Sequence, residues 1–288
     1  NVLALLEPPK DPDRAVTALW PDPNRVREPA YMDYLRTTLK PFVGKLRAEG
    51  LMKYAYLYGF DERNQEHYKG IDETWKALKA EFPDLPVMTT ARMYKDMALA
   101  KEGTNFPYAV TTDWYCPLTS VWKRDLTAQL HALGKEVWWY TCCGPLYPFA
   151  NFASIEEPYF ESQILAWQTW LEKADGFLFW SVNWWVRMPR ADERDTFLAG
   201  KFLDSDLQVQ GDGILTYPGK DGIYPSIRLA ALRDGVQDYE LLQLAAAKLG
   251  REKVEKLGAA FIRGPDDFDR DPQALLAARR WLYEKLEE

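Results

Sequence analysis

A chain of 288 residues can form one large domain or two small ones and can bury a substantial core. Its net charge of −7 and the lack of any Lys/Arg-rich run argue against nucleic acid or an anionic membrane as a partner. Because it has 2 histidines and 3 cysteines, His-dependent triads, His-rich metal sites and a disulfide framework are disfavoured, and an enzyme of this composition would rely on carboxylates.

Hydrophobic periodicity predicts helices alternating with short strands from residue 29 onward. Helices are expected over 29–50, 64–81, 120–134, 156–174, 224–250 and 272–287. Pro41 should bend or divide the first helix, Asp72 is a candidate N-cap in the second, and Ser120 could cap the third. Strands are expected over 54–60, 85–90, 108–113, 136–141 and 176–182, and the Gly-rich stretch 211–222 resembles a hairpin or an excursion.

This alternation indicates an α/β fold with a parallel sheet, and we expect a (β/α)8 barrel. Five strands do not close such a barrel, so residues 1–28 are expected to add one strand. A missing N-terminal segment or a partner chain would supply the rest; the first residue, Asn1, fits a mature form or a fragment. We expect the barrel over residues 1–220, with C-terminal helices at 221–288 packed on the same domain. A doubly wound open sheet is the alternative, although no GxGxxG or P-loop motif supports it.

Other classes of site find little support in the sequence. No apolar stretch approaches the roughly 20 residues of a transmembrane helix. Cys142 and Cys143 are adjacent, and adjacent cysteines rarely bridge; no CxxC or Cys/His cluster suggests zinc. We therefore expect no metal or cofactor. The acidic stretch with Asp234, Asp238 and Glu240 has helical spacing and is interpreted as a structured helix face.

Asp61 and Glu62 are adjacent carboxylates at the end of the strand "YAYLYGF". Such a pair suits sugars that carry a 2-acetamido group, whose own oxygen attacks the anomeric carbon. One carboxylate would orient and stabilise the amide while its neighbour protonates the leaving oxygen. Alternatively, the two acids begin the following helix, where its dipole favours negative charge.

Aromatic residues make up 14% of the chain, and several of them gather near predicted strand ends. They either fill a bulky core or line a cleft for a flat, partly apolar ligand such as a sugar ring. Strand alternation places Trp138 and Tyr140 on one face and Trp139 on the other. Candidate sugar contacts at strand ends are Tyr58, Asp113, Tyr140, Trp180, Asn183 and Trp184. Asp113 could instead cap the loop that follows it.

Several motifs that occur in order resemble glycoside hydrolase family 123, which includes β-N-acetylgalactosaminidases. They are "YLYGFDE" (56–62), "VWWYTCCGPLYP" (137–148), "DGFLFWSVNWW" (175–185), "GDGILTYPG" (211–219) and "PSIRLAALRDGVQDYELL" (225–242). The resemblance implies a barrel and a retaining, substrate-assisted mechanism. Asp61 would polarise the acetamido group, and Glu62 would be the general acid/base. Family members also carry an N-terminal β-sandwich and early barrel strands, which are not visible in this sequence.

The expected function is therefore hydrolysis of terminal β-linked N-acetylgalactosamine from a glycan or glycoconjugate. The resemblance slightly favours a secreted or periplasmic location. Two alternatives stay open: a non-catalytic carbohydrate-binding fragment of such a barrel, and a glycosidase of the same scaffold with another sugar specificity.

Overall fold

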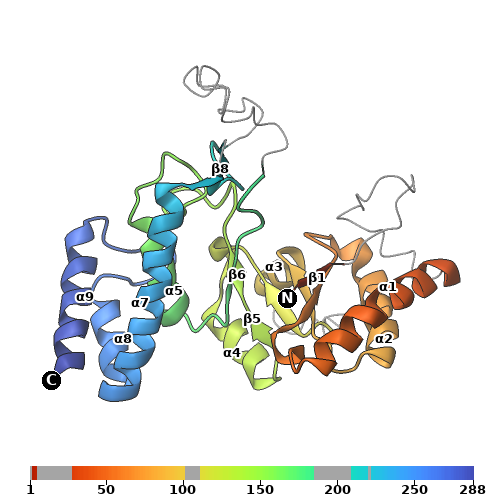
Figure 1. Ribbon diagram of the computed structural model, residues 1–288. Coiled ribbons are helices and arrows are strands. Elements are labelled where there is room, and N and C mark those ends of the chain that lie inside the picture. The colour runs from red at the N-terminus through yellow and green to blue at the C-terminus, as the bar shows by residue number, and fades with distance from the viewer. Residues whose placement is uncertain (1, 5–27, 101–110, 185–208, 220–221) are drawn as a thin grey trace. The chain divides into compact units, whose positions relative to one another are not determined.

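The computed structural model describes residues 2–4, 28–100, 111–184, 209–219 and 222–288 (Figure 1). The chain forms two compact units. The first contains residues 1–117 and 121–138, and the second contains residues 118–120 and 139–288. The boundary predicted at residue 220 falls inside the second unit.

The first unit is built on a five-stranded sheet in the order β1-β2-β3-β4-β5, with every neighbouring pair parallel. Its strands are β1 (Val2–Ala4), β2 (Tyr56–Tyr58), β3 (Val87–Thr90), β4 (Trp114–Cys116) and β5 (Glu136–Val137). Its helices are α1 (Pro29–Ala48), α2 (Tyr68–Glu81), α3 (Arg92–Leu99) and α4 (Arg124–Ala132). The short 3-10 helices are η2 (Met52–Tyr54), η3 (Gln65–His67) and, between β4 and α4 in sequence, η5 (Thr119–Val121).

The strand that we expected within residues 1–28 is confirmed, because β1 pairs with β2. A complete barrel is not. Among the described residues, β1 and β5 form the two edges of an open parallel sheet, and no closed sheet is present. The fold shown is thus a mixed α/β fold with a parallel sheet.

Three local predictions were wrong. Of the strand predicted over 108–113 only residues 111–113 are described, and they precede the strand β4, which begins at Trp114. Asp72 is no N-cap but a buried residue inside α2, where it pairs with Lys76 at 2.6 Å. Ser120 lies in η5, and the N-cap of α4 is Lys123. Helix α1 also continues through Pro41 without a break in its assignment.

The strand register places the residues near Asp61 and an aromatic cluster on the same face of this sheet. Tyr58 pairs with Met88, and Thr90 pairs with Cys116, so strand alternation puts Tyr58, Thr90 and Cys116 on one face. Tyr56, Trp114 and Trp138 share that face and form an aromatic cluster with ring centroids 4.9–5.4 Å apart. Part of the aromatic surplus therefore fills the core.

The described residues of the second unit form two small sheets and four helices. Strands β6 (Trp139–Tyr140) and β7 (Phe177–Leu178) are parallel, while β8 (Thr216–Pro218) and β9 (Ile223–Pro225) form an antiparallel hairpin. A hairpin was one of two interpretations of residues 211–222, but its second strand lies beyond that stretch and enters the range expected as helix. The helices are α5 (Glu161–Leu171), α7 (Ile227–Leu249), α8 (Arg251–Ala259) and α9 (Pro272–Glu287). Ser226 caps α7, because its side chain accepts a hydrogen bond from the N–H of Leu229.

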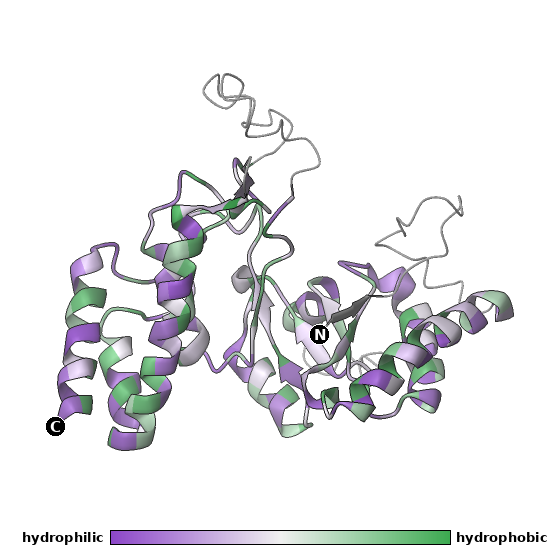
Figure 2. Cartoon of the chain, viewed as in Figure 1, coloured by the Kyte–Doolittle hydropathy of each residue, from purple (hydrophilic) through white to green (hydrophobic). Residues whose placement is uncertain are grey.

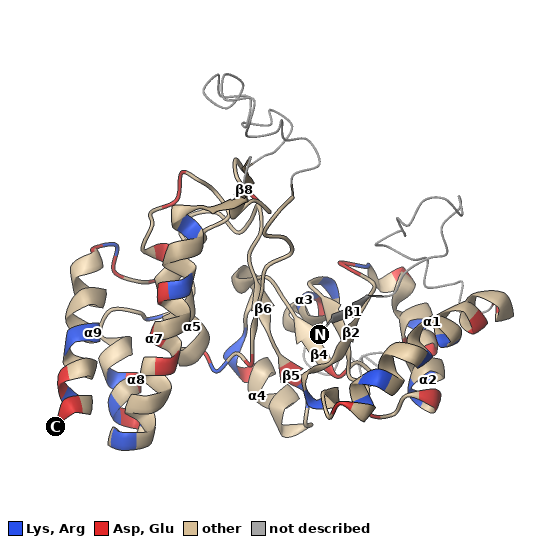
Figure 3. Cartoon of the chain, in the orientation of Figure 1, with Lys and Arg blue, Asp and Glu red and all other residues tan. Residues whose placement is uncertain are grey.

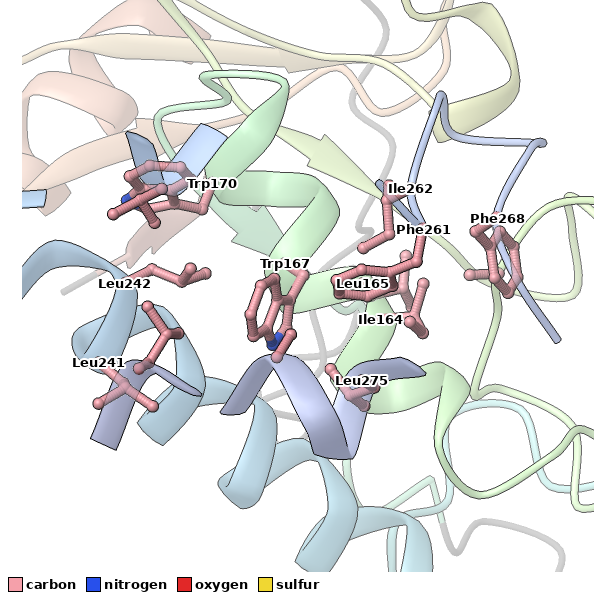
Figure 4. Close-up of a cluster of buried hydrophobic side chains, with 14 of the residues drawn as sticks. Ile164, Leu165, Trp167, Trp170, Leu241, Leu242, Phe261, Ile262, Phe268 and Leu275 are labelled. Atoms are coloured by element: carbon pink, nitrogen blue, oxygen red, sulfur yellow. The ribbon is translucent and has the colours of Figure 1, made fainter. Parts of the chain in front are cut away.

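The core of the second unit lies between α5 and α7–α9, with Trp167 near its centre (Figure 4). Hydrophobic and polar residues alternate along these helices (Figure 2), and the buried hydrophobic residues form this core. Helices α5 and α7 approach closely at Gly235, where a Cβ atom would lie 2.9 Å from the Ser162 carbonyl oxygen. Asp238 of the acidic stretch is buried, accepts a hydrogen bond from Trp167 Nε1 (3.0 Å) and forms an ion pair with Arg279 Nε (2.6 Å), which agrees with a structural role.

No helix in the described parts of the chain is long and apolar enough to cross a membrane. Basic and acidic residues are interspersed along α7, α8 and α9, without a continuous stretch of one sign (Figure 3).

The stability of the second unit should depend on pH through the buried carboxyl group of Glu161. Burial raises its pKa to about 7, although Arg270 Nη1 lies 2.6 Å away and the N–H of Asn151 also bonds to it. A carboxyl with a raised folded pKa stabilises the fold below its unfolded pKa of about 4.3, and this contribution is lost as pH rises through about 7.

We expect wild type to lose stability relative to Glu161→Gln between pH 4.5 and 7.5, as measured by urea midpoints across that range. Glu252→Gln, at an exposed ion pair on α8, is the control and should show little such trend. A pH-independent difference between wild type and Glu161→Gln would contradict the raised pKa.

Candidate functional site

The chain turns sharply where β2 ends. Phe60 and Glu62 both have positive φ angles, 58° and 51°, and at the end of β3 Ala91 has a φ of 48°. Residues other than glycine rarely adopt a positive φ angle, which costs about 1–2 kcal/mol per residue. Such strain persists where the surrounding structure enforces it, and it is concentrated at functional sites. Here it places Asp61 and Glu62 at the C-terminal edge of the parallel sheet.

Two hydroxyl groups hold the Asp61 carboxylate. Tyr58 Oη donates to Asp61 Oδ1 at 2.5 Å, and Thr90 Oγ1 donates to the same oxygen. The Thr90 hydroxyl also accepts the backbone N–H of Glu62 at 3.1 Å. Thr90 therefore connects both acids to the end of β3 and fixes their orientation.

Burial and the negative charge of Asp61 favour the neutral forms of the neighbouring Tyr58 hydroxyl and Cys116 thiol. Burial, reinforced by the Asp61 charge, raises the pKa of Tyr58 well above its ordinary value. The same two causes, in the same order, raise the pKa of the buried Cys116 thiol. Asp61 is partly buried whereas Glu62 is exposed. The two adjacent acids thus have different environments, as two different chemical roles require.

The backbone at Glu62 can be tested by substitution. Glu62→Gly should be more stable than Glu62→Ala by about 0.5–1 kcal/mol, because glycine adopts positive φ without strain. Urea unfolding of both variants measures the difference. At Glu66, in the short helix η3, the order should reverse and alanine should be the more stable. Equal stability of the two Glu62 variants would contradict the strained turn.

Asp113 lies where the strands of the sheet begin, so the prediction that it lies at the C-terminal end of a strand was wrong. It directly precedes β4, and its carboxylate accepts the backbone N–H of Val87, the first residue of β3. Lys79 lies 2.6 Å and Lys135 3.8 Å from the same carboxylate. Asp113 thus links the first residue of β3 to the chain just before β4, and its negative charge offsets the positive charges of Lys79 and Lys135.

A substitution separates this role from sugar binding. Asp113→Asn should lower the free energy of unfolding by about 1–2 kcal/mol, because it leaves Lys79 and Lys135 facing each other. Asp84→Asn, which breaks an exposed pair with Arg47, should cost less than 1 kcal/mol. Urea unfolding provides the measurement. A folded Asp113→Asn protein with unchanged stability but weakened glycoside binding would instead support a ligand role.

In the second unit, Trp180 and Trp184 form an exposed aromatic pair with centroids 5.2 Å apart and planes at 60°. Trp180 Nε1 donates to Asp212 Oδ1 at 2.9 Å. A Cβ atom at Gly213 would lie 2.2 Å from the Trp180 ring, so only glycine fits there, and its φ of 73° also requires glycine. This pair, its carboxylate and its glycine form what we call the tryptophan platform: Trp180, Trp184, Asp212 and Gly213.

The sequence matches the family model "Glycoside hydrolase 123, catalytic domain" over residues 13–245, most of the chain. The chain belongs to glycoside hydrolase family 123. No curated protein matches it.

Among solved structures, the chain resembles that of a family 123 glycoside hydrolase from Clostridium perfringens, which was solved to explain glycolipid glycan hydrolysis. The TM-score is 0.61 at 16% sequence identity, which shows a shared fold. The match covers 90% of this chain and 45% of that protein, so the chain spans less than half the length of its structural relative.

The structure brings some of the predicted residues of this family 123 chain together. Tyr58, Asp61 and Glu62 lie around one turn, and Trp180 and Trp184 lie in the tryptophan platform. Tyr140 ends β6 as a buried residue, and the exposed Asn183 forms a backbone bridge with Ile214. Trp138 packs on Trp114 in the first unit, and Trp139 Nε1 donates to Thr169 Oγ1 in the second.

Sequence reasoning assigned no role to Thr90, Cys116 or Asp212. Thr90 lies at a predicted strand end, which was its one available signal; Asp212 lies in a Gly-Asp-Gly stretch that also favours a turn. The described ranges contain no group of three or more His, Cys, Asp or Glu residues arranged to hold a metal ion.

Proposed function

We propose that this family 123 domain is a retaining glycoside hydrolase that removes terminal β-linked N-acetylgalactosamine by substrate-assisted catalysis. The observation that carries the proposal is the turn after β2, where two hydroxyls fix Asp61 beside an exposed Glu62. A carboxylate that is already oriented avoids the entropic cost of aligning it with the reacting amide.

In the first step, the acetamido oxygen of the substrate attacks the anomeric carbon as the glycosidic bond breaks. Glu62 gives its proton to the leaving oxygen, and Asp61 accepts a hydrogen bond from the acetamido N–H as positive charge develops on the amide. The product of this step is an oxazolinium ion. In the second step, Glu62 takes a proton from water, which attacks the same carbon and opens the ring. Two inversions give net retention.

The sugar-contacting residues that we propose in the second unit are argued from their own chemistry alone. Trp180 and Trp184 offer aromatic faces for the apolar side of a pyranose ring, while Tyr140 and Asn183 offer hydrogen-bonding groups. The Clostridium perfringens relative acts on glycolipid glycans. A glycolipid glycan ending in N-acetylgalactosamine is therefore the substrate that we propose to test first.

The direct test measures hydrolysis of an aryl β-N-acetylgalactosaminide. We expect turnover that is faster than on the gluco epimer and competitive inhibition by a thiazoline mimic of the oxazolinium. The matched control is the aryl β-galactoside, which lacks the acetamido nucleophile and should not be cleaved. Hydrolysis of the galactoside at a comparable rate would contradict substrate assistance, because a protein nucleophile would then be required.

The exposed pair of Trp180 and Trp184 favours a second candidate, carbohydrate binding without catalysis, because aromatic faces can bind a sugar ring without a reacting group. This function predicts saturable binding of N-acetylgalactosamine with no turnover and with Glu62→Gln leaving affinity unchanged. Calorimetric titration together with the aryl glycoside assay distinguishes the two candidates.

A further inference from the structure

Cys142 and Cys143 follow β6, and their Sγ atoms are 3.9 Å apart. In an extended strand, neighbouring side chains point to opposite faces, which keeps adjacent thiols apart. Here the chain bends, and the N–H of Cys142 donates to the Gly144 carbonyl at 2.8 Å. The bend brings both thiols to one side, so that closing an S–S bond of about 2.05 Å requires an approach of only about 2 Å.

The buried side chain of Asn151 maintains this bend. Its Nδ2 donates to the carbonyls of Cys142 and Pro145, both at 3.0 Å, on either side of the second thiol. Its Oδ1 accepts the N–H groups of Phe152 (2.7 Å) and Ala153 (2.9 Å). The two thiols are thereby held close before any reaction, which reduces the entropy lost on ring closure.

The two thiols differ in access. Cys143 is exposed, whereas Cys142 is half-buried and burial raises its pKa to about 12. Because Cys143 is the accessible thiol, it is the residue that reacts first. The third cysteine, Cys116, is buried in the first unit and serves as an internal reference.

We propose that Cys142 and Cys143 form a reversible redox modification site, which closes to a vicinal disulfide on reaction with a small-molecule disulfide such as glutathione disulfide. The Cys143 thiolate attacks one glutathione sulfur, and a glutathione thiolate leaves. Cys142 loses its proton to that thiolate and attacks Cys143 Sγ, which expels the second glutathione. In total, two thiols and one glutathione disulfide become one protein disulfide and two glutathione molecules.

Such a bond is suited to regulation and not to structural support. Adjacent Cα atoms are about 3.8 Å apart across a trans peptide, below the usual range of about 4.4–6.8 Å for a disulfide. The resulting strain makes the bond easy to reduce. This strain is the reason why adjacent cysteines rarely bridge, and it is compatible with a labile bridge.

Closure would be transmitted to the tryptophan platform. The backbone N–H of Cys143 donates to the Asp212 carboxylate, which in turn accepts Trp180 Nε1 at 2.9 Å. Twisting the peptide between the two cysteines moves this N–H group. Asp212 and the Trp180 indole therefore respond to the redox state of the pair.

The test treats the reduced protein with glutathione disulfide and follows intact mass and peptide maps. Wild type and Cys116→Ser should lose two hydrogens from the Cys142–Cys143 peptide, retain no glutathione and recover on reduction. Cys142→Ser should keep one glutathione on Cys143, because the resolving thiol is missing. Tryptophan fluorescence should change on oxidation of wild type and not of Trp180→Phe, with circular dichroism confirming that each variant is folded.

Lasting glutathione adducts on wild type, a bond to Cys116 or to a second molecule, or no reaction at Cys143 would each overturn the proposal. A fluorescence change that persists in Trp180→Phe would overturn the link to the tryptophan platform. None of these measurements uses enzymatic activity, so their outcome is independent of the proposed function.

Discussion

Asp61→Asn should reduce kcat on an aryl β-N-acetylgalactosaminide by about 10²–10⁴-fold with little loss of stability. The amide keeps the shape of the carboxylate, so Tyr58 and Thr90 retain an acceptor at Oδ1. It lacks the negative charge that would stabilise the oxazolinium. Steady-state kinetics and urea unfolding on the same preparation separate the two effects.

Glu62→Gln provides the matched comparison, because its defect should depend on the leaving group. A substrate with a good leaving group, such as a dinitrophenol, needs little protonation and should be cleaved by Glu62→Gln far better than a poor one. Asp61→Asn should impair both substrates similarly. Full activity of Asp61→Asn would exclude the mechanism, and equal defects of Glu62→Gln on both substrates would exclude general acid catalysis by Glu62.

Arg228→Met should destabilise the second unit by more than about 3 kcal/mol. Its buried guanidinium donates to four backbone carbonyls, those of Phe152 (3.1 Å), Ala153 (2.5 Å), Gly211 (3.0 Å) and Ile214 (2.5 Å). Methionine fills a similar volume but leaves these acceptors without their donor. Urea unfolding monitored by circular dichroism measures the loss.

Two further variants control this result. Arg233→Met alters an exposed arginine on the same helix and should change stability by less than 1 kcal/mol. Arg228→Lys keeps the charge but has no planar fork, so it should rescue only part of the loss. Equal stability of Arg228→Met and Arg233→Met would show that Arg228 does not hold these loops together.

The sequence predicted those parts of the fold that depend on local pattern. The strand predicted over 54–60 and the helix predicted over 224–250 are confirmed as β2 and α7, because apolar periodicity is a local signal, whereas the caps predicted at Asp72 and Ser120 were wrong. Asp113 was misplaced because "YAVTTD" has the alternation of a strand, whereas the pairing is made by the following "WYC". The position of Asp113 is explained by Lys79 and Lys135, which are distant in sequence.

The candidate site was predictable in part for the same reason. Two adjacent acids at a strand end are visible in the sequence, but their supports are not. Thr90 lies 29 residues from Asp61, and Arg228 lies 75 residues from the Ala153 carbonyl that it binds. Only the register of the sheet and the packing of loops bring such partners together, and no periodicity encodes them.

The contact between Gly213 and Trp180 also limits how related sequences can diverge. A side chain at residue 213 would occupy the volume of the indole ring, and the positive φ angle would add strain. If a small residue replaces Trp180, the clash at residue 213 is removed but the strain of its positive φ angle remains. In an alignment of this family, we expect glycine at 213 to persist after the tryptophan is lost, and a tryptophan at 180 never to occur beside a larger residue at 213.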